Sequence, residues 1–246
     1  MSGTSSRTGR LFGVGVGPGD PELLTLKAAR IIEAADVVAS FAKKGRASNA
    51  RAVVADRLTG KCEITLSYPV TTELHRHDAA YRGAIGAFYE EAAAGIAALL
   101  DQGLDVAVLS EGDPLFYGSY MHLHCRLAAR YTAEVVPGVT GMSGGWSQAG
   151  IAIAQGDDVT TILPGTLEEN DLVTRLSMTD AAIIMKLGRN LPKVRRALAA
   201  SGRIGEALYV ERATTPASRI LRLDEKADET APYFSIVLVP GWRGTP

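Results

Sequence analysis

Short apolar runs alternate with amphipathic segments through the first half of the chain. The run at residues 11–16 leads into a glycine-rich turn at 17–20, which is typical of a buried strand that ends at a turn. Apolar residues recur at helical spacing over 21–35, and Asp20 and Pro21 suit the N-cap and first position of that predicted helix. Strand, turn and helix then repeat, which predicts βαβ units and a mainly parallel sheet. The further elements predicted here are a strand at 36–40, a helix at 82–101 and a strand at 105–109.

The second half opens with a strand at 134–136 that runs into the turn Pro137-Gly138. The last two strands predicted in this half lie close in sequence, which indicates an antiparallel component. The predicted helices are 140–149 and 191–200, and the predicted strands are 181–185, 207–211, 219–223 and 234–239. We therefore expect an α/β fold of two domains with a cleft between them. A loose tail at 1–10 precedes an N-terminal α/β domain at 11–138 and a C-terminal α/β domain at 139–246.

Composition and charge narrow the class of protein. The chain has 246 residues, is 46% hydrophobic and carries a formal net charge of −1, which is typical of a soluble globular protein and does not favour a broad nucleic-acid-binding surface. Cys62 and Cys125 are isolated thiols, as expected in a reducing compartment. Residues 1–10 lack the apolar core of a signal peptide, and no run of about 18 apolar residues is found. We expect a cytoplasmic protein without a membrane span.

Two turns share the sequence Gly-Asp-Pro, and each follows an apolar strand. They are Gly19-Asp20-Pro21 and Gly112-Asp113-Pro114, and each is expected to open a helix. Both would then lie at the carboxyl ends of strands, where open α/β sheets bind ligands. A G-x-G-x-x-G frame that starts at Gly13 meets Pro18 at its last position, and no G-x-x-x-x-G-K-[ST] sequence occurs, so the dinucleotide and P-loop fingerprints are both absent. The alternative is that both turns only cap helices.

Other chemistries find little support in the sequence. Two clusters with histidine, at 75–78 and 122–124, have no H-E-x-x-H pattern and no neighbouring pair of cysteines, so we expect solvated histidines rather than a metal site. No G-x-S-x-G elbow supports a serine hydrolase. Two basic groups after strand ends would suit a substrate with several carboxylates, and a solvated face is the alternative. They are Lys43, Lys44, Arg46 and Arg51, and Lys186, Arg189, Lys193, Arg195 and Arg196.

Five segments in order along the chain resemble those of the tetrapyrrole methyltransferases, S-adenosylmethionine-dependent enzymes of corrin and sirohaem biosynthesis. They are GVGPGDPELLTLKA, SEGDPLFYGS, VPGVTG, IIMKLGRNLPKV and ERATTP, and they span nearly the whole chain after residue 10. Segments 67–72, 118–124 and 185–188 resemble those of the members that methylate a meso carbon of the macrocycle. Glu111 and Lys186 stand where the uroporphyrinogen-III methyltransferases carry Gly and Met, which argues against that sister activity.

The resemblance implies a cofactor, a substrate and a set of site residues. S-adenosylmethionine would bind between the two domains of a homodimeric enzyme, a tetrapyrrole with several carboxylates would be methylated, and S-adenosylhomocysteine would be released. No metal, nucleic acid or membrane is implied. Asp20 is the candidate catalytic residue, as a stabiliser of the cationic macrocycle and acceptor of its proton, and its N-cap role is the alternative. The residues implied in cofactor binding are Pro18, Glu111, Gly112, Asp113, Phe116, Thr140, Gly141, Met185, Lys186, Leu187, Ala213, Phe234 and Ser235.

Three alternatives stay open. The same methylation on a cobalt-loaded substrate is one, because the metal would lie in the tetrapyrrole rather than in the protein. A protein methylase similar to diphthine synthase would need a protein partner, and turnover of a tetrapyrrole would exclude it. A protein that binds the cofactor without turnover would keep both glycine turns, and methyl transfer would exclude that class.

Overall fold

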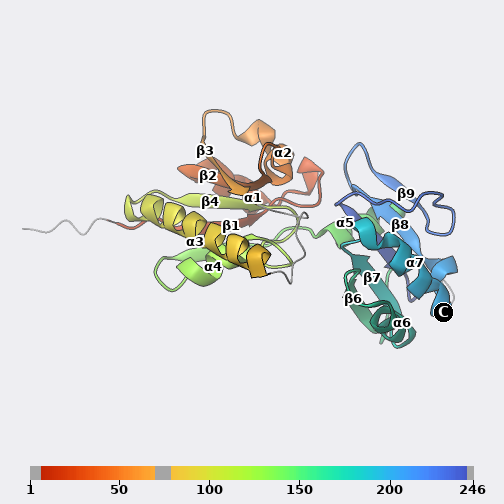
Figure 1. Cartoon of the computed structure of the whole chain (residues 1–246). Coiled ribbons are helices and arrows are strands. Elements are labelled where there is room, and N and C mark those ends of the chain that lie inside the picture. Colours follow the sequence, from red (N-terminus) through yellow and green to blue (C-terminus); the bar gives the residue numbers. More distant parts are fainter. Residues whose placement is uncertain (1–6, 70–78, 243–246) are drawn as a thin grey trace, which may run out of the picture. The chain divides into compact units, whose positions relative to one another are not determined.

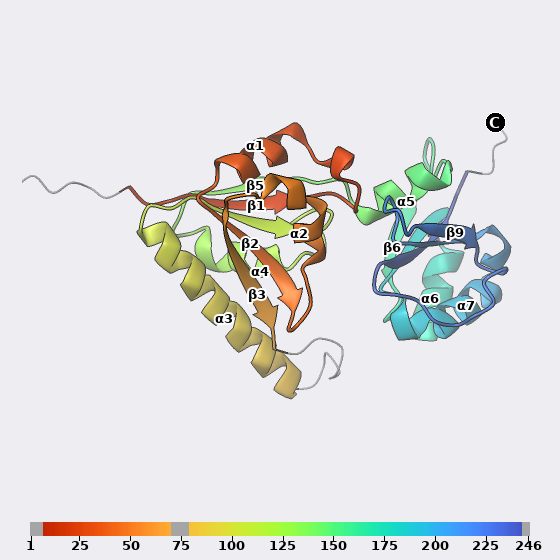
Figure 2. The same ribbon diagram turned by 90° about the horizontal axis from the view of Figure 1, so that it is seen from above.

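The computed structural model describes residues 7–69 and 79–242, and the chain divides into two compact units, Met1–Thr140 and Gly141–Pro246. Each unit is built on one sheet of strands with helices against it (Figure 1, Figure 2). The elements of the first unit are β1 (Leu11–Gly15), α1 (Leu26–Ala34), β2 (Val37–Lys43), α2 (Asn49–Val53), β3 (Cys62–Tyr68), α3 (Ala79–Asp101), β4 (Val106–Ser110), α4 (Tyr120–Leu127) and β5 (Ala133–Val136).

The first sheet is parallel throughout, with strand order β3-β2-β4-β1-β5. Its central strands are apolar on both faces because helices cover both. In β4, Val106 and Val108 pack in one core with α3 and α4, whereas Ala107 and Leu109 pack in a second core with α1 and α2. Gly15 of β1 pairs in register with Ser110 of β4, so these two strands end level with each other.

The second sheet is mixed, as the sequence predicted. Its order is β6-β7-β10-β8-β9, with β6 and β7 parallel and the other neighbours antiparallel. The last two strands of the chain are not neighbours, however, because β10 lies between β7 and β8. The elements are α5 (Gly141–Ala149), β6 (Thr160–Pro164), α6 (Glu169–Ser177), β7 (Ala181–Met185), α7 (Leu191–Ala200), β8 (Leu208–Glu211), β9 (Arg219–Arg222) and β10 (Ser235–Val239).

Both predicted helix starts at the Gly-Asp-Pro turns need correction. After the first turn, Asp20 caps only the 3-10 turn Pro21–Leu23, and α1 begins at Leu26. The reason is local: Thr25 is extended, and its hydroxyl accepts a hydrogen bond from Ala28 N at 3.1 Å, which makes Thr25 a second N-cap. After the second turn, α4 begins only at Tyr120, because Tyr117 adopts a positive φ of 56°.

Helix α3 contains a segment, Arg82–Asp101, that is long and apolar enough by length and composition to cross a membrane. Five of its residues, Ala92, Ala93, Ile96, Ala97 and Leu100, are instead buried in the core that α3 shares with the sheet. A long core helix passes the same test of length and composition. The feature is therefore explained by packing within the first unit.

A carboxylate clamp joins the amino-terminal ends of β1 and β4. Asp105 accepts hydrogen bonds from Arg10 N at 2.8 Å and Arg10 Nη2 at 2.7 Å, and it also forms an ion pair with Arg7 at 3.2 Å. Burial disfavours the charged carboxylate, but the hydrogen bonds of Arg10 and the charges of both arginines outweigh this and lower the pKa of Asp105.

Substitution of Asp105→Asn is expected to lower the free energy of unfolding by about 1–2 kcal/mol at pH 7, a modest figure because both arginines are partly exposed. A lowered pKa in the folded state means that the stabilisation is complete above the unfolded-state pKa and is lost as the pH falls through the folded-state pKa. Urea unfolding at pH 7 and at several acidic pH values should therefore show a smaller acid loss for the variant. Asp224→Asn, in an exposed pair with Arg222, is the control and should behave like the wild type.

Candidate functional site

Three turns of the first unit meet at the carboxyl ends of β1, β4 and β5. Gly112 N donates to Gly17 O at 2.8 Å, which joins the two predicted Gly-Asp-Pro turns, and Val16 N donates to Ser110 O at 3.0 Å. The third turn, Pro137-Gly138, is tied to the second by a 3.3 Å bond from Gly138 N to Asp113 Oδ2. The prediction that both turns lie at the same edge of the sheet is therefore confirmed.

Glycine is required where these turns touch. A Cβ atom on Gly15 would lie 2.6 Å from Gly112 O and 2.6 Å from Gly138 N. A Cβ on Gly138 would lie only 2.1 Å from Gly112 O. We call Gly15, Gly112 and Gly138 the glycine cluster. It brings three backbone segments closer than any side chain allows, and it does so at the strand ends where ligands of α/β sheets bind.

The carboxylates predicted at this edge are partly used by the fold. Asp20 Oδ1 accepts from Glu22 N at 2.8 Å, and Asp113 Oδ1 accepts from Leu115 N at 2.9 Å. Glu111 Oε1 accepts from Ala50 N at 3.2 Å, and desolvation of its carboxyl group raises its pKa, although the residue as a whole is exposed.

Ser110 belongs to this edge and was not predicted as a site residue. Its hydroxyl is buried, the residue is 4% exposed, and no hydrogen-bond partner of Oγ exists among the described residues. The signal in the sequence is weak, since it is one polar residue at the end of the apolar run at 105–109. Pro18 and Phe116 lie in the two turns and are partly exposed. Thr140, also partly exposed, ends the first unit, and Gly141 opens α5 at the start of the second.

In the second unit, one of the two predicted residues after β7 lies on strained backbone. Lys186 has a φ of 57°, an unusual conformation for a side-chain-bearing residue, and such outliers concentrate at functional sites. Gly165 N donates to Met185 O at 2.7 Å, which ties the end of β6 to this turn. Leu187 is 0% exposed and packs in the core, so only its backbone is able to meet a ligand.

A second strained turn follows β8. Ala213 lies between Arg212 (φ 48°) and Thr214 (φ 66°), and Thr214 N donates to Gln148 Oε1 of α5 at 2.7 Å. Phe234 is 38% exposed just before β10, whereas Ser235 is buried and donates to Pro232 O at 2.6 Å. The hydroxyl of Ser235 is therefore already used within the chain.

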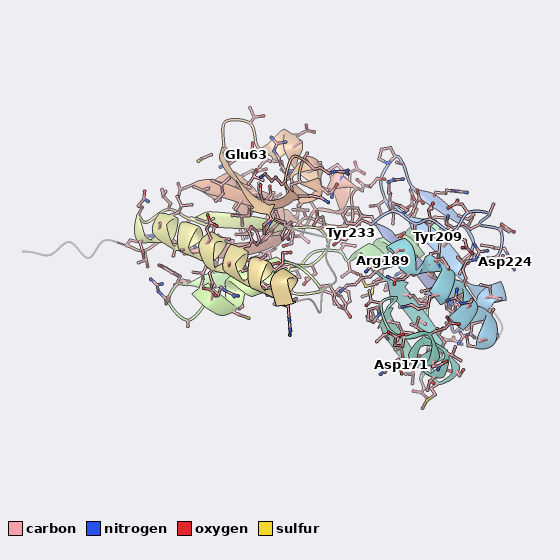
Figure 3. The ribbon with its side chains drawn as sticks, viewed as in Figure 1. Glu63, Asp171, Arg189, Tyr209, Asp224 and Tyr233 are labelled. Atoms are coloured by element: carbon pink, nitrogen blue, oxygen red, sulfur yellow. The ribbon has the colours of Figure 1, made fainter. Side chains whose placement is uncertain are left out.

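Several residues of the two predicted basic groups already form ion pairs or hydrogen bonds within the chain. Arg51 pairs with Glu63 and Arg196 with Glu169 in solvent-exposed ion pairs, and Arg195 donates to Lys226 O at 2.7 Å, so all three already have partners within the chain. Arg189 lies on the 3-10 turn Gly188–Asn190 that follows β7 (Figure 3). A substrate role of this group stays a prediction.

The structure describes only one of the two histidine clusters considered in the sequence. Residues 75–78 lie outside the described residues, as do residues 70–72 of the segment 67–72. His122 is exposed and stacks on Tyr89 with ring centroids 4.2 Å apart, and His124 Nδ1 lies 3.3 Å from the Tyr120 hydroxyl. Partial desolvation of the ring, followed by the charge of Arg126, lowers the pKa of His122. Among the described residues, no group of three metal-ligating side chains comes together.

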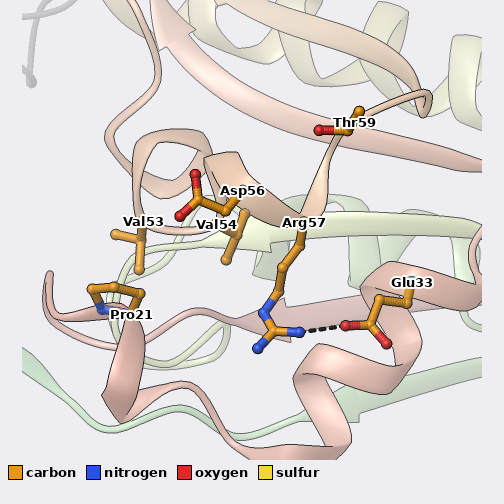
Figure 4. A pocket seen from close by; sticks show the side chains of 7 residues that line it. All are labelled: Pro21, Glu33, Val53, Val54, Asp56, Arg57 and Thr59. Carbon is orange, nitrogen blue, oxygen red and sulfur yellow. Dashed lines mark hydrogen bonds and ion pairs between the residues drawn. The ribbon is translucent and has the colours of Figure 1, made fainter.

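A surface pocket of about 460 Å³ lies beside α1 and the segment that follows α2 (Figure 4). Its charged pair, Arg57 and Glu33, is neutralised by an ion pair. Pro21 is the one lining residue that belongs to the first Gly-Asp-Pro turn. The lining residues are Pro21, Glu33, Val53, Val54, Asp56, Arg57 and Thr59. The pocket thus includes none of the glycine cluster.

The first unit has a parallel sheet with close-packed glycine turns at its carboxyl edge, and the second has a mixed sheet with strained turns. Comparison with known proteins identifies the family to which such a chain belongs. The chain fits the model of the Tetrapyrrole (Corrin/Porphyrin) Methylases over residues 10–227, and it belongs to this family. It is 59% identical, over 100% of both chains, to a Sinorhizobium protein named precorrin-2 C(20)-methyltransferase. It is 29% identical, over 94% of this chain and 96% of the relative, to a Salmonella typhimurium protein named cobalt-precorrin-2 C(20)-methyltransferase.

Longer relatives and solved structures agree with this membership. The cobalamin biosynthesis protein CobIJ of Mycobacterium tuberculosis is 49% identical over 97% of this chain, which spans about half (47%) of that longer protein. The structure of uroporphyrin-III C-methyltransferase from Thermus thermophilus, complexed with S-adenosyl homocysteine, has a TM-score of 0.64 at 25% identity and covers 94% of this chain and 97% of that one. The expected α/β fold is confirmed.

Proposed function

We propose that the chain transfers a methyl group from S-adenosylmethionine to C20 of precorrin-2, which yields precorrin-3A and S-adenosylhomocysteine in cobalamin biosynthesis. The observation that carries the proposal is the 59% identity, over the full length of both chains, to a protein named for this reaction. A feature of the structure supports the proposal: the glycine cluster and the buried hydroxyl of Ser110 lie at the carboxyl edge of a parallel sheet, where α/β sheets generally bind ligands.

The residues at this edge fit the polar amino-acid part of the methyl donor. Glycine lets the backbone approach a ligand closely. The second Gly-Asp-Pro turn would hold the methionine and ribose through Glu111, Gly112, Asp113 and Phe116. Met185, Lys186, Leu187, Ala213 and Phe234 would face the adenine, with Pro18, Thr140, Gly141 and Ser235 completing the set. When bound, S-adenosylmethionine supplies a methyl group already activated by its sulfonium.

The task of the chain is then chiefly to position the two reactants, since a well-oriented reaction needs no strong electrophile from the protein. Strained turns at Lys186 and Thr214 fix backbone direction at the edge of the second sheet. Asp20 is proposed to stabilise the positive charge that methylation leaves on the macrocycle and to accept its proton. The N-cap bond to Glu22 N occupies one of its oxygens.

The metal-free substrate is favoured over its cobalt-loaded counterpart by the relatives. The protein named for precorrin-2 is 59% identical, whereas the one named for cobalt-precorrin-2 is 29% identical. We also propose, from the family resemblance, that the enzyme works in the cytoplasm as a homodimer. Sedimentation of the purified chain tests the dimer.

The test of the reaction is anaerobic incubation of the purified chain with precorrin-2 and methyl-labelled S-adenosylmethionine, with the position of the label read by NMR. Label at C20 is expected. The cobalt-loaded substrate, run in parallel, is expected to react more slowly. Donor binding without methylation of either tetrapyrrole would contradict the proposal and favour a protein that binds the cofactor without turnover.

The substitution Asp20→Asn is expected to lower kcat by about 100-fold, because an amide does not accept the proton. Asparagine caps helices as well as aspartate does, so the free energy of unfolding should stay within about 0.5 kcal/mol of the wild type. Steady-state kinetics and urea unfolding measure the two effects. Glu22→Gln, next to Asp20 in the same turn, is the control and should keep its kcat. An unchanged kcat in the Asp20 variant would leave this residue as a helix cap only.

A further inference from the structure

Two buried side-chain atoms in the described part of the chain lack a hydrogen-bond partner, Ser110 Oγ and Thr166 Oγ1. Ser110 is the last residue of β4, which pairs in parallel with β1, and Thr166 follows the carboxyl end of β6, which pairs in parallel with β7. An unsatisfied buried hydroxyl is unfavourable for folding, so groups of this kind concentrate where a ligand or water completes them. Ser110 is the more enclosed residue, at 4% exposed.

The strand pattern places the side chain of Ser110 on the same face as the glycine cluster. Side chains alternate along β4, and Ser110 shares its face with Val106 and Val108. Its register partner Gly15 would direct a Cβ atom to this face, where Gly112 O and Gly138 N lie within 2.6 Å of that position. A hydroxyl without a partner therefore lies on the face where three turns expose backbone polar atoms.

We propose that Ser110 is a binding residue for the methyl donor, and that its hydroxyl hydrogen-bonds to the charged amino-acid end of S-adenosylmethionine. The inference rests on the proposed function. A hydroxyl both donates and accepts, so it suits an end that carries an ammonium and a carboxylate. In a buried, low-dielectric position such a bond to a charged group contributes more than one between neutral groups.

The experiment compares two nucleosides by titration calorimetry. S-adenosylhomocysteine carries the amino-acid end, and 5′-methylthioadenosine lacks it. The substitution Ser110→Ala is expected to weaken binding of S-adenosylhomocysteine about tenfold and to leave 5′-methylthioadenosine within about twofold of the wild type. Ser40→Ala is the matched control: Ser40 is 5% exposed on the neighbouring strand β2, and its position in the alternation places it on the opposite face.

Stability separates this role from a structural one. Because Ser110 Oγ has no hydrogen-bond partner among the described residues, removal of the hydroxyl is expected to leave the thermal midpoint of the ligand-free protein equal or higher. A lower midpoint with equal loss of affinity for both nucleosides would overturn the proposal, and so would unchanged affinity for S-adenosylhomocysteine. If the wild type binds neither nucleoside, the proposed function itself fails and this inference falls with it.

Discussion

Substitution of Gly138→Ala is expected to abolish binding of S-adenosylmethionine and to destabilise the first unit by about 3 kcal/mol. The new Cβ would lie 2.1 Å from Gly112 O and 2.9 Å from Gly15 Cα, and all of these are backbone atoms that no rotamer change relieves. The turns after β1, β4 and β5 would have to move apart. Since the same turns form the proposed donor site, affinity and stability should fall together.

Titration calorimetry and urea unfolding followed by circular dichroism measure the two effects. Gly95→Ala is the control, because a Cβ on this residue of α3 meets nothing within 4 Å. Alanine is the better helix former, so the control should gain about 0.5–1 kcal/mol of stability and bind the donor as the wild type does. Normal donor affinity in Gly138→Ala would show that the glycine cluster lies away from the site.

Substitution of Arg203→Met is expected to destabilise the second unit by about 3–5 kcal/mol. The guanidinium donates to Thr179 O at 2.9 Å and Asp180 O at 2.7 Å, and it pairs with Glu206 at 3.0 Å. The side chain is 13% exposed, so water replaces these bonds poorly. Methionine fills much of the same volume but leaves the carbonyls before β7, and Pro240 O after β10, without their donor.

Tryptophan fluorescence reports this effect selectively, because both tryptophans, Trp146 and Trp242, belong to the second unit. The urea midpoint read by fluorescence should fall, while circular dichroism should retain a transition at the wild-type midpoint from the first unit. Arg196→Met is the matched control, since its ion pair with Glu169 is exposed and contributes little. Equal midpoints for the two variants would contradict the role given to Arg203.

The pattern of apolar residues predicted the central elements of both sheets. Helix α7 and strand β7 occur over the predicted residues, because each is a clear amphipathic or apolar run between polar segments. Strand β3 was missed because it is an edge strand whose residues alternate between exposed and half-buried. Strand β6 and helix α6 were also missed, because polar residues such as Thr160 and Asn170 interrupt the apolar pattern by which the other elements were predicted.

The part of the candidate site that depends on the type of residue in a turn could be predicted from the sequence. Two Gly-Asp-Pro turns after apolar strands indicated a shared edge, and the structure joins them through Gly112 and Gly17. The close approach of Gly138 to Gly112 could not be predicted, since it depends on the order of β1, β4 and β5 in the sheet. The same holds for the buried hydroxyl of Ser110, because its lack of a hydrogen-bond partner among residues 7–69 and 79–242 is a property of the folded structure.

The central position of β10 makes the second unit dependent on its last strand. Without β10, the pairs β6–β7 and β8–β9 share no strand contact, and the inner edges of β7 and β8 present unpaired backbone groups. The first sheet is complete at Val136, before any strand of the second is synthesised. During synthesis the first unit is thus able to fold while the second still lacks residues 235–239, and a chain truncated before that point would carry a half-formed second sheet open to aggregation and proteolysis.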